Sequence, residues 1–262
     1  VCTKAVINLD DPWGQFMVDH ANGETLTYGV TNPKADLRAE EIVHKASGVT
    51  FRAVYKGKSV PVQLAIPGTF SVYNALGVLG NMLQLGISLE DSAKAMATAT
   101  GVKGRVEVVP TDGDYTILID YAHTPDALDN VLTAMREVTQ GRLVVLFGCG
   151  GDRDRTKRPK MGKIAAEKAD FVIVTSDNPR TEDPEAIISE ILAGMEHTRT
   201  PKQVICNRPE AIEWAITHHQ PGDVIILAGK GHEDYQIIGK EKFHMDEREI
   251  VAEILKRRRE NR

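Results

Sequence analysis

Residues 171–180 read FVIVTSDNPR, an apolar run that passes directly into a polar loop. A short, continuous run of Val and Ile is typical of a strand buried on both faces of a parallel sheet. In open α/β sheets, ligands bind beyond the carboxyl ends of the strands, where this loop offers Asp177, Asn178, Pro179 and Arg180. We therefore expect a strand that ends in a site for a small zwitterion; the alternative is a solvated turn before a helix.

Two further apolar runs end in glycine-rich, charged loops. Residues 144–147 lead into GCGGDRDR at 148–155, and residues 224–227 lead into AGKGHED at 228–234. Glycine lets the backbone approach a ligand closely, and the charged residues supply fixed recognition points. An idle connection between a strand and a helix needs neither, so the three loops together predict one shared site.

The pattern of the chain changes near residue 100. We expect an α/β protein in two parts, residues 1–101 and residues 102–262, joined by the linker TGVKG at 100–104. In the second part, strand and helix patterns alternate, which predicts a Rossmann-like domain with a mostly parallel sheet. Its expected strands lie at about 115–120, 142–147, 171–175, 202–206 and 223–228.

The first part is expected to be rich in β-structure. It begins with an apolar strand at 5–9, and residues 49–55 and 60–64 flank Lys-Gly-Lys as a hairpin, with Pro61 indicating an edge strand. Helices are expected at about 72–84 and from Ser88, which forms a capping pair with Asp91.

Composition limits the classes of function. With 262 residues, 42% of them hydrophobic, the chain can bury ample core, and its net charge of -5 argues against nucleic acid as a partner. No apolar run has membrane length, so we expect a cytoplasmic protein without membrane insertion. Cys2, Cys149 and Cys206 form no CxxC pair, which predicts neither a disulfide framework nor a cysteine zinc site.

Four other polar residues are candidates for a nucleotide site. Asp120 and His123 flank the end of the strand at 115–120. At that position a carboxylate can accept hydrogen bonds from ribose hydroxyls, and an imidazole can pack against a base. Arg105, beside the linker, can reach a phosphate, and Asn74 can hydrogen-bond an adenine edge. Taken singly, each residue has a structural alternative: a local Asp–His pair, a surface ion pair or a helix cap.

Several of these segments resemble motifs of the Mur ligases, and they occur in the same order. The resemblance covers essentially the whole chain, and so many motifs at fitting spacing are highly specific. The segments are NLDD at 8–11, YNAL at 73–76, GR at 104–105, DYAHTP at 120–125, GCGGDR at 148–153, DNPR at 177–180 and GKGHED at 229–234.

The resemblance is strongest to the Mur ligases that add the third residue of the peptidoglycan stem peptide. It implies that ATP phosphorylates a carboxylate of UDP-N-acetylmuramoyl-L-alanyl-D-glutamate and that the amine of meso-diaminopimelate attacks the acyl phosphate, with Mg²⁺ stabilising the charge. The chain would be the second half of the central ATPase domain followed by the C-terminal domain. No GxxxxGK[ST] phosphate loop is present, so we expect the chain to be inactive alone, with the Mg²⁺ ligands mostly upstream and none in this segment.

The resemblance also implies roles for individual residues. Arg180 and Arg153 would grip the distal carboxylate of meso-diaminopimelate, which lysine lacks, and Glu233 would take the distal ammonium. No general base is identified. Asn74, Arg105, Asp120 and His123 match nucleotide-lining positions, and the incoming amino acid would be held by Arg153, Asp177, Asn178, Pro179, Arg180, Gly229 and Glu233.

Two other classes of function stay open. A nicotinamide- or flavin-binding oxidoreductase can use the same kind of sheet, although GxGxxG is absent after the first strand of the second part. A non-catalytic module that binds an amino acid or a nucleotide is the other alternative. Folylpolyglutamate synthetase is a lesser ligase alternative, because the DNPR segment points away from folate.

Overall fold

The computed structural model describes residues 3–99 and 101–260. The chain forms two compact units, unit 1 with residues 1–100 and unit 2 with residues 101–262. The boundary expected from the sequence, between residues 101 and 102, stays a prediction. Two residues named in the expectations, Cys2 and Thr100, lie outside the described residues.

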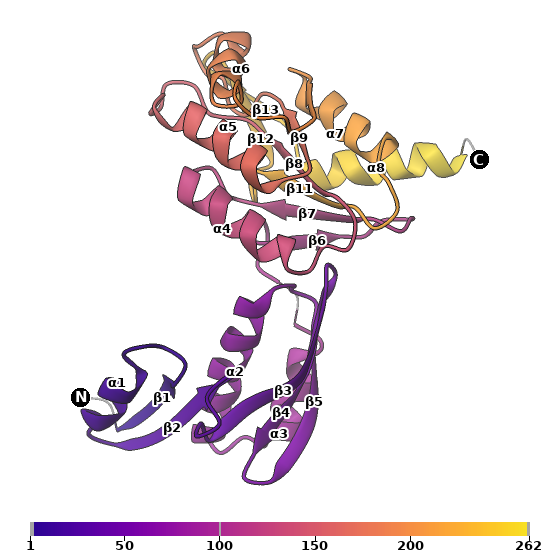
Figure 1. Ribbon diagram of the computed structural model, residues 1–262. Helices are drawn as coiled ribbons and strands as arrows, with labels where there is room; N and C mark the ends of the chain where they lie inside the picture. The colour runs from indigo at the N-terminus through magenta and orange to yellow at the C-terminus, as the bar shows by residue number, and fades with distance from the viewer. Residues whose placement is uncertain (1–2, 100, 261–262) are drawn as a thin grey trace. The chain divides into compact units, whose positions relative to one another are not determined.

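Unit 1 is a mixed sheet with helices packed against it (Figure 1). Its strand order is β1-β2-β3-β4-β5; β1, β2 and β3 are parallel, and β3, β4 and β5 form antiparallel pairs. Leu37, Leu76 and Leu79 are fully buried in its core. The elements are β1 (Lys4–Asn8), α1 (Gly14–Asp19), β2 (Glu24–Gly29), β3 (Leu37–Lys45), β4 (Gly48–Tyr55), β5 (Lys58–Leu64), α2 (Thr69–Gln84) and α3 (Leu89–Met96).

The expected hairpin is present. Lys56 and Gly57 form its two-residue turn with φ of 48° and 78°, and β5, which carries Pro61, is an edge strand. The cap at Ser88 is also confirmed, since its hydroxyl accepts a hydrogen bond from the backbone N–H of Asp91. The strands β2 and β3 were not individually predicted from the sequence.

Unit 2 alternates strands and helices, as predicted. Thr124 and Asp183 cap their helices, and a proline begins each of the two. The elements are β6 (Glu107–Val109), β7 (Thr116–Asp120), α4 (Pro125–Arg136), β8 (Leu143–Phe147), α5 (Lys157–Lys168), β9 (Phe171–Val174), α6 (Pro184–Ala193), β10 (Lys202–Val204), α7 (Arg208–Thr217), β11 (Val224–Ala228), β12 (Tyr235–Ile238), β13 (Glu241–His244) and α8 (Glu247–Glu260).

The main sheet of unit 2 has the order β10-β9-β8-β11-β7-β6, and its strands are parallel except for β6 at the edge. The chain passes from β7 to β8, continues outward to β10, and then returns to insert β11 between β7 and β8. The connections that leave β7 and β8 lead to α4 and α5 on one face of the sheet, whereas the connection that leaves β11 leads to α8 on the other face (Figure 1). This divergence makes the carboxyl end of β11 a topological switch point, where open α/β sheets bind ligands.

Both faces of this sheet are buried. Helices α4 and α5 lie on one side of it and α7 and α8 on the other (Figure 1). Ile117, Leu146 and Ile225 point into the core with α7 and α8. Because side chains alternate along a strand, both halves of each strand's pattern must be apolar, which explains the continuous apolar runs in the sequence.

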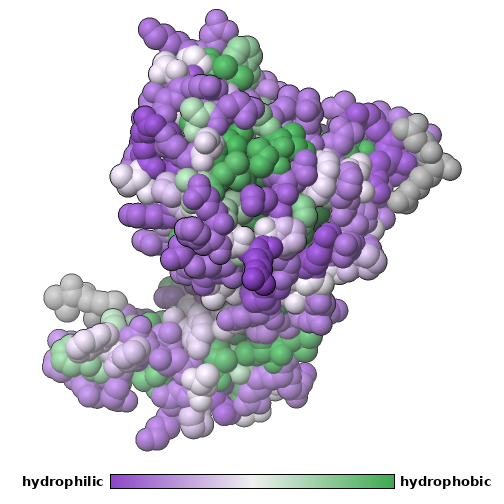
Figure 2. Space-filling model, turned by 45° about the horizontal axis from the view of Figure 1, so that its top comes forward, coloured by the Kyte–Doolittle hydropathy of each residue, from purple (hydrophilic) through white to green (hydrophobic). Residues whose placement is uncertain are grey.

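Hydrophilic residues cover most of the face shown in Figure 2, as expected for a chain in which 26% of the residues are charged. No described helix is long and apolar enough to cross a membrane.

Candidate functional site

A hollow of about 590 Å³ lies in unit 2, lined by residues that follow β7, β8, β9 and β11. These strands are parallel neighbours, so the loops after them meet at one edge of the sheet. The hollow gathers most of the residues predicted from the sequence: Arg153, Asp177, Asn178, Arg180, Gly229, Glu233 and His123.

The loop after β9 is held in an uncommon conformation. Arg180 has φ of 52°, in the left-handed region that favours glycine. Its backbone is fixed there because its N–H donates to the carbonyl of Ile237 at 3.1 Å and its carbonyl accepts from Gly239 at 2.7 Å. Its Nη1 donates to the carbonyl of Gly151 at 2.9 Å. A non-glycine residue kept in this region by several contacts is typical of a functional site.

The loop after β8 packs directly against that segment. A Cβ on Gly151 would lie 1.9 Å from the carbonyl oxygen of Pro179, so only glycine permits this approach. The N–H of Gly151 donates to the carbonyl of Asn178 at 2.9 Å. Pro179 does not line the hollow; it is buried beside the glycine loop. Arg153 is exposed at the rim, where its Nη1 donates to the carbonyl of Asp152.

A buried ion network underlies the same loop. Arg158 is fully buried, and its guanidinium donates to Glu182 at 2.8 Å and 2.9 Å and to the carbonyl of Gly150 at 3.2 Å. Hydrogen bonding from Arg158 lowers the pKa of Glu182 to about 2. Glu182 also accepts the N–H of Asp152 at 2.6 Å. The network therefore ties the loop after β8 to the one after β9.

Lys230, in the loop after β11, is a residue to which sequence reasoning assigned no role. Its side chain is fully buried, and its ammonium donates to Asn178 Oδ1 at 3.0 Å and lies 2.9 Å from Glu233 Oε2. The Nδ2 of Asn178 donates to the same Glu233 oxygen at 3.0 Å. The only signal in the sequence was the position of this lysine between two glycines, which equally suits an exposed cation.

Asp120, which was predicted to accept hydrogen bonds from ribose hydroxyls, already accepts two backbone hydrogen bonds. One carboxylate oxygen accepts the N–H of Val106 and the other the N–H of Ala122, each at 2.8 Å. Burial raises the pKa of Asp120, although these hydrogen bonds oppose that effect. Its carboxylate therefore holds the segment before β6 against the end of β7. Val106 itself has φ of 45°, so this segment needs such support.

Aromatic and cationic groups surround the end of β7. The ring of His123 lies 4.6 Å from that of Tyr121, and His232 lies 4.9 Å from Tyr121 on centroid distances. The guanidinium carbon of Arg105 lies 5.3 Å from the Tyr121 centroid. Of the four predicted nucleotide residues, three thus belong to this part of unit 2. Asn74 is an exposed residue of α2 in unit 1.

No group of three or more His, Cys, Asp and Glu side chains that could hold a metal ion occurs within residues 3–99 and 101–260.

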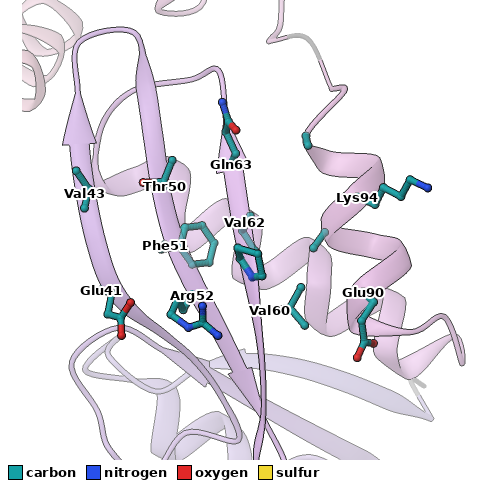
Figure 3. Close-up of a pocket in the computed structure, with 13 residues that line it drawn as sticks. Glu41, Val43, Thr50, Phe51, Arg52, Val60, Val62, Gln63, Glu90 and Lys94 are labelled. Atoms are coloured by element: carbon teal, nitrogen blue, oxygen red, sulfur yellow. The ribbon is translucent and has the colours of Figure 1, made fainter.

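Unit 1 contains a separate hollow of about 630 Å³ between β3, β4, β5 and α3 (Figure 3). Val60 and Val62 contribute apolar surface to it. Its charged side chains do not converge: Arg52 is engaged with Ser59 Oγ at 2.8 Å, and Lys94 extends away from the strands (Figure 3). The carboxylates of Glu41 and Glu90 also line this hollow, but none of the site residues predicted from the sequence does.

Family models match both parts of the chain. Residues 2–82 match the Mur ligase middle domain, and residues 104–231 match the Mur ligase glutamate ligase domain. The chain belongs to the Mur ligase family. Both family domains are therefore represented, and the hollow lies in the segment matched by the ligase domain and just beyond its end.

Among curated Mur ligases, a UDP-N-acetylmuramoyl-L-alanyl-D-glutamate–2,6-diaminopimelate ligase from Caldanaerobacter subterraneus subsp. tengcongensis is 49% identical over 251 residues, 96% of this chain and 52% of that protein. The enzyme of the same name from Trichormus variabilis is 47% identical over 258 residues, covering 97% and 52%. The chain thus spans about half the length of the curated relatives it matches.

Solved structures of Mur ligases are also similar to this chain. A structure of a UDP-N-acetylmuramoyl-L-alanyl-D-glutamate–2,6-diaminopimelate ligase has a TM-score of 0.81 at 36% identity, over 98% of this chain and 54% of that one. The MurF ligase from Thermotoga maritima in complex with ADP has a TM-score of 0.61 at 18% identity, over 98% and 54%. The second likeness establishes the shared fold alone.

Proposed function

We propose that this chain provides the amino-acid site of an ATP-dependent ligase that adds meso-diaminopimelate to UDP-N-acetylmuramoyl-L-alanyl-D-glutamate. The observation that carries the proposal is the meeting, around one hollow, of the guanidinium groups of Arg153 and Arg180 with the carboxylates of Asp177 and Glu233. Meso-diaminopimelate carries two carboxylates and two ammonium groups, so it needs partners of both signs.

Each end of the amino acid has a proposed partner. Arg180 and Arg153 would bind the distal carboxylate, because a guanidinium matches the planar geometry of a carboxylate with two parallel hydrogen bonds. Glu233 would bind the distal ammonium. Lysine has the ammonium and lacks the carboxylate, so it would leave the two guanidinium groups without an anion. The likeness to relatives named as diaminopimelate ligases supports this choice of amino acid.

ATP supplies the leaving group in the proposed reaction, because it converts a carboxylate of the UDP-linked dipeptide into an acyl phosphate. In unit 2 the rings of Tyr121 and His123 and the guanidinium of Arg105 suit stacking against a base and contact with a phosphate. Asn74 in unit 1 is the remaining proposed nucleotide contact. Asp120 would act by shaping this wall, since backbone N–H groups already engage both of its oxygens.

Isothermal titration calorimetry on the 262-residue chain tests the amino-acid site. We expect meso-diaminopimelate to bind and L-lysine to bind at least tenfold more weakly, because a buried polar site discriminates strongly against a ligand that lacks one of its groups. L,L-diaminopimelate is a stereochemical control with identical charges. Equal binding of lysine and meso-diaminopimelate, or binding of neither, contradicts the proposal.

A further inference from the structure

The buried ammonium of Lys230 organises three groups that face the proposed amino-acid site. It lies 2.9 Å from Glu233 Oε2, 3.0 Å from Asn178 Oδ1 and 3.6 Å from Asp177 Oδ1. The side chain of Lys230 is fully buried, whereas Asp177, Asn178 and Glu233 line the hollow. Lys230 itself is absent from that lining, so it acts from behind the residues that would touch a ligand.

Lys230 determines which way the amide of Asn178 points. The Oδ1 atom of Asn178 accepts hydrogen bonds from Lys230 and from the backbone N–H of Ile237 at 2.9 Å. A reversed amide would set its NH₂ group against two donors, which cannot pair with it. Its Nδ2 must therefore face Glu233, and it donates to Glu233 Oε2 at 3.0 Å. The same glutamate oxygen thus receives two donors and is held in place.

The cluster of Lys230, Asp177 and Glu233 has an excess of negative charge, which favours binding of one cation. Lys230 carries one positive charge opposite the two carboxylates of Asp177 and Glu233, so the three groups together carry one net negative charge. Asp177 Oδ1 is buried and has no hydrogen-bond partner among the described residues, since Lys230 is too distant at 3.6 Å. This unpaired oxygen adds negative charge beside the hollow that Asp177 lines, and that charge favours an ammonium group of a ligand there.

From these contacts we infer that Lys230 is a positioning residue that sets Glu233 and Asn178 to receive the distal ammonium of the amino acid. The inference rests on the proposed function of this site. It assigns the discrimination between ligands with and without that ammonium to a lysine that the ligand does not touch. The ring of Tyr235, which also lines the hollow, has its centroid 5.3 Å from the Lys230 ammonium.

The test compares two ligands that differ in one group. Meso-diaminopimelate has the distal ammonium, and L-2-aminopimelate keeps both carboxylates without it. Calorimetry on the wild-type chain should show tighter binding of meso-diaminopimelate. In Lys230→Met, its affinity should fall about 10- to 100-fold, the range of one charge-assisted hydrogen bond, while that of L-2-aminopimelate changes little. The ratio of the two affinities should therefore approach one.

Lys163→Met is the matched control, because Lys163 is an exposed lysine of α5 paired only at 3.7 Å with Glu167. It should leave the ratio unchanged. If Lys230→Met weakens both ligands equally, or neither, the positioning role is wrong while the proposed function stands. If the wild-type chain binds neither ligand, the proposed function fails, and the inference fails with it.

A measurement on the wild-type chain covers the case in which Lys230→Met does not fold. A buried, hydrogen-bonded ammonium exchanges its protons slowly, so ¹⁵N-lysine labelling should give a resolved NH₃⁺ signal for Lys230. Meso-diaminopimelate should shift this signal strongly, and L-2-aminopimelate should shift it much less. Equal shifts with both ligands would overturn the inference without any variant.

Discussion

Replacement of Arg180 by alanine tests the proposed basis of amino-acid selectivity. In the structure the Arg180 side chain is half-buried, and its Nη1 donates to the carbonyls of Gly151 at 2.9 Å and Asn178 at 3.4 Å. Within the described residues, these two bonds leave Nε and Nη2 unengaged. These are the two donors that form a parallel pair of hydrogen bonds with one carboxylate.

The size of the effect follows from that geometry. A hydrogen bond to a charged group contributes about 1.5–3 kcal/mol, and partial exposure of Arg180 places a bidentate pair at about 2–4 kcal/mol in total. At 1.4 kcal/mol for each factor of ten, Arg180→Ala should weaken the binding of meso-diaminopimelate about 30- to 700-fold. Lysine should lose little, because it has no distal carboxylate. Arg180→Lys should recover only part of the loss, because an ammonium lacks the paired donors.

The assay is calorimetry with both amino acids on the wild type, Arg180→Ala and Arg180→Lys, with Arg199→Ala as a control at an exposed arginine between α6 and β10. The alanine variant also loses the contact with Gly151, which loosens the loop for both ligands alike. The diagnostic quantity is therefore the ratio of the two affinities. An unchanged ratio in Arg180→Ala would refute the assignment of this loop to selectivity, however far both affinities fell.

Three predictions concern stability. Gly104 has φ of 73°, and in Gly104→Ala the new Cβ would lie 2.2 Å from the carbonyl carbon of Gly231. We expect the free energy of unfolding to fall by about 2 kcal/mol or more and the Tm, measured by calorimetry, to fall by about 4–8 °C. The control is Gly86→Ala, at φ of 85° in open space, which should lose about 1 kcal/mol. Burial opposes ionisation of Asp10, but hydrogen bonds from Val30, Thr31 and Tyr73 lower its pKa to about 2. The ionised carboxylate therefore stabilises the fold above pH 4, and this stabilisation is lost as the pH falls through 2. The difference in Tm between wild type and Asp10→Asn should shrink between pH 7 and pH 2. The free energy of unfolding of Arg180→Gly should exceed that of Arg180→Ala by about 1 kcal/mol, because glycine adopts φ of 52° without strain. Equal stability of the two variants would mean that the backbone is not strained.

Much of unit 2 could be predicted from the sequence because its strands are buried on both faces. Such strands appear as continuous apolar runs, and their ends are marked by the first polar residues. The antiparallel part of unit 1 is harder, because β3 carries charges on its exposed face and has an irregularity between Glu40 and Val43, with Glu41 at φ of 52°. The break removes the simple alternation that identifies a half-buried strand.

Prediction of the site residues was limited by contacts between distant segments. The approach of the loops after β8, β9 and β11 follows from strand order, and parallel topology places their ends together. Burial of Lys230 does not follow from its neighbours in the chain: it depends on Asn178, 52 residues earlier, and on Asn178 being oriented by Ile237. The occupied oxygens of Asp120 likewise depend on Val106, whose positive φ has no local signature.

The distribution of backbone strain in unit 2 supports a functional reason for this arrangement. Asp152 and Arg180 have φ of 53° and 52°, and they lie in the two loops that pack together through Gly151. Glycine at either position would relieve the strain, but it would also remove the acceptor for Thr181 at Asp152 and the guanidinium at Arg180. Backbone strain that persists where glycine would relieve it indicates that the side chains are needed. Because the Arg180 side chain lines the hollow, we propose that this strained conformation is kept for ligand recognition. The ratio of the meso-diaminopimelate and lysine affinities in Arg180→Gly would test that proposal.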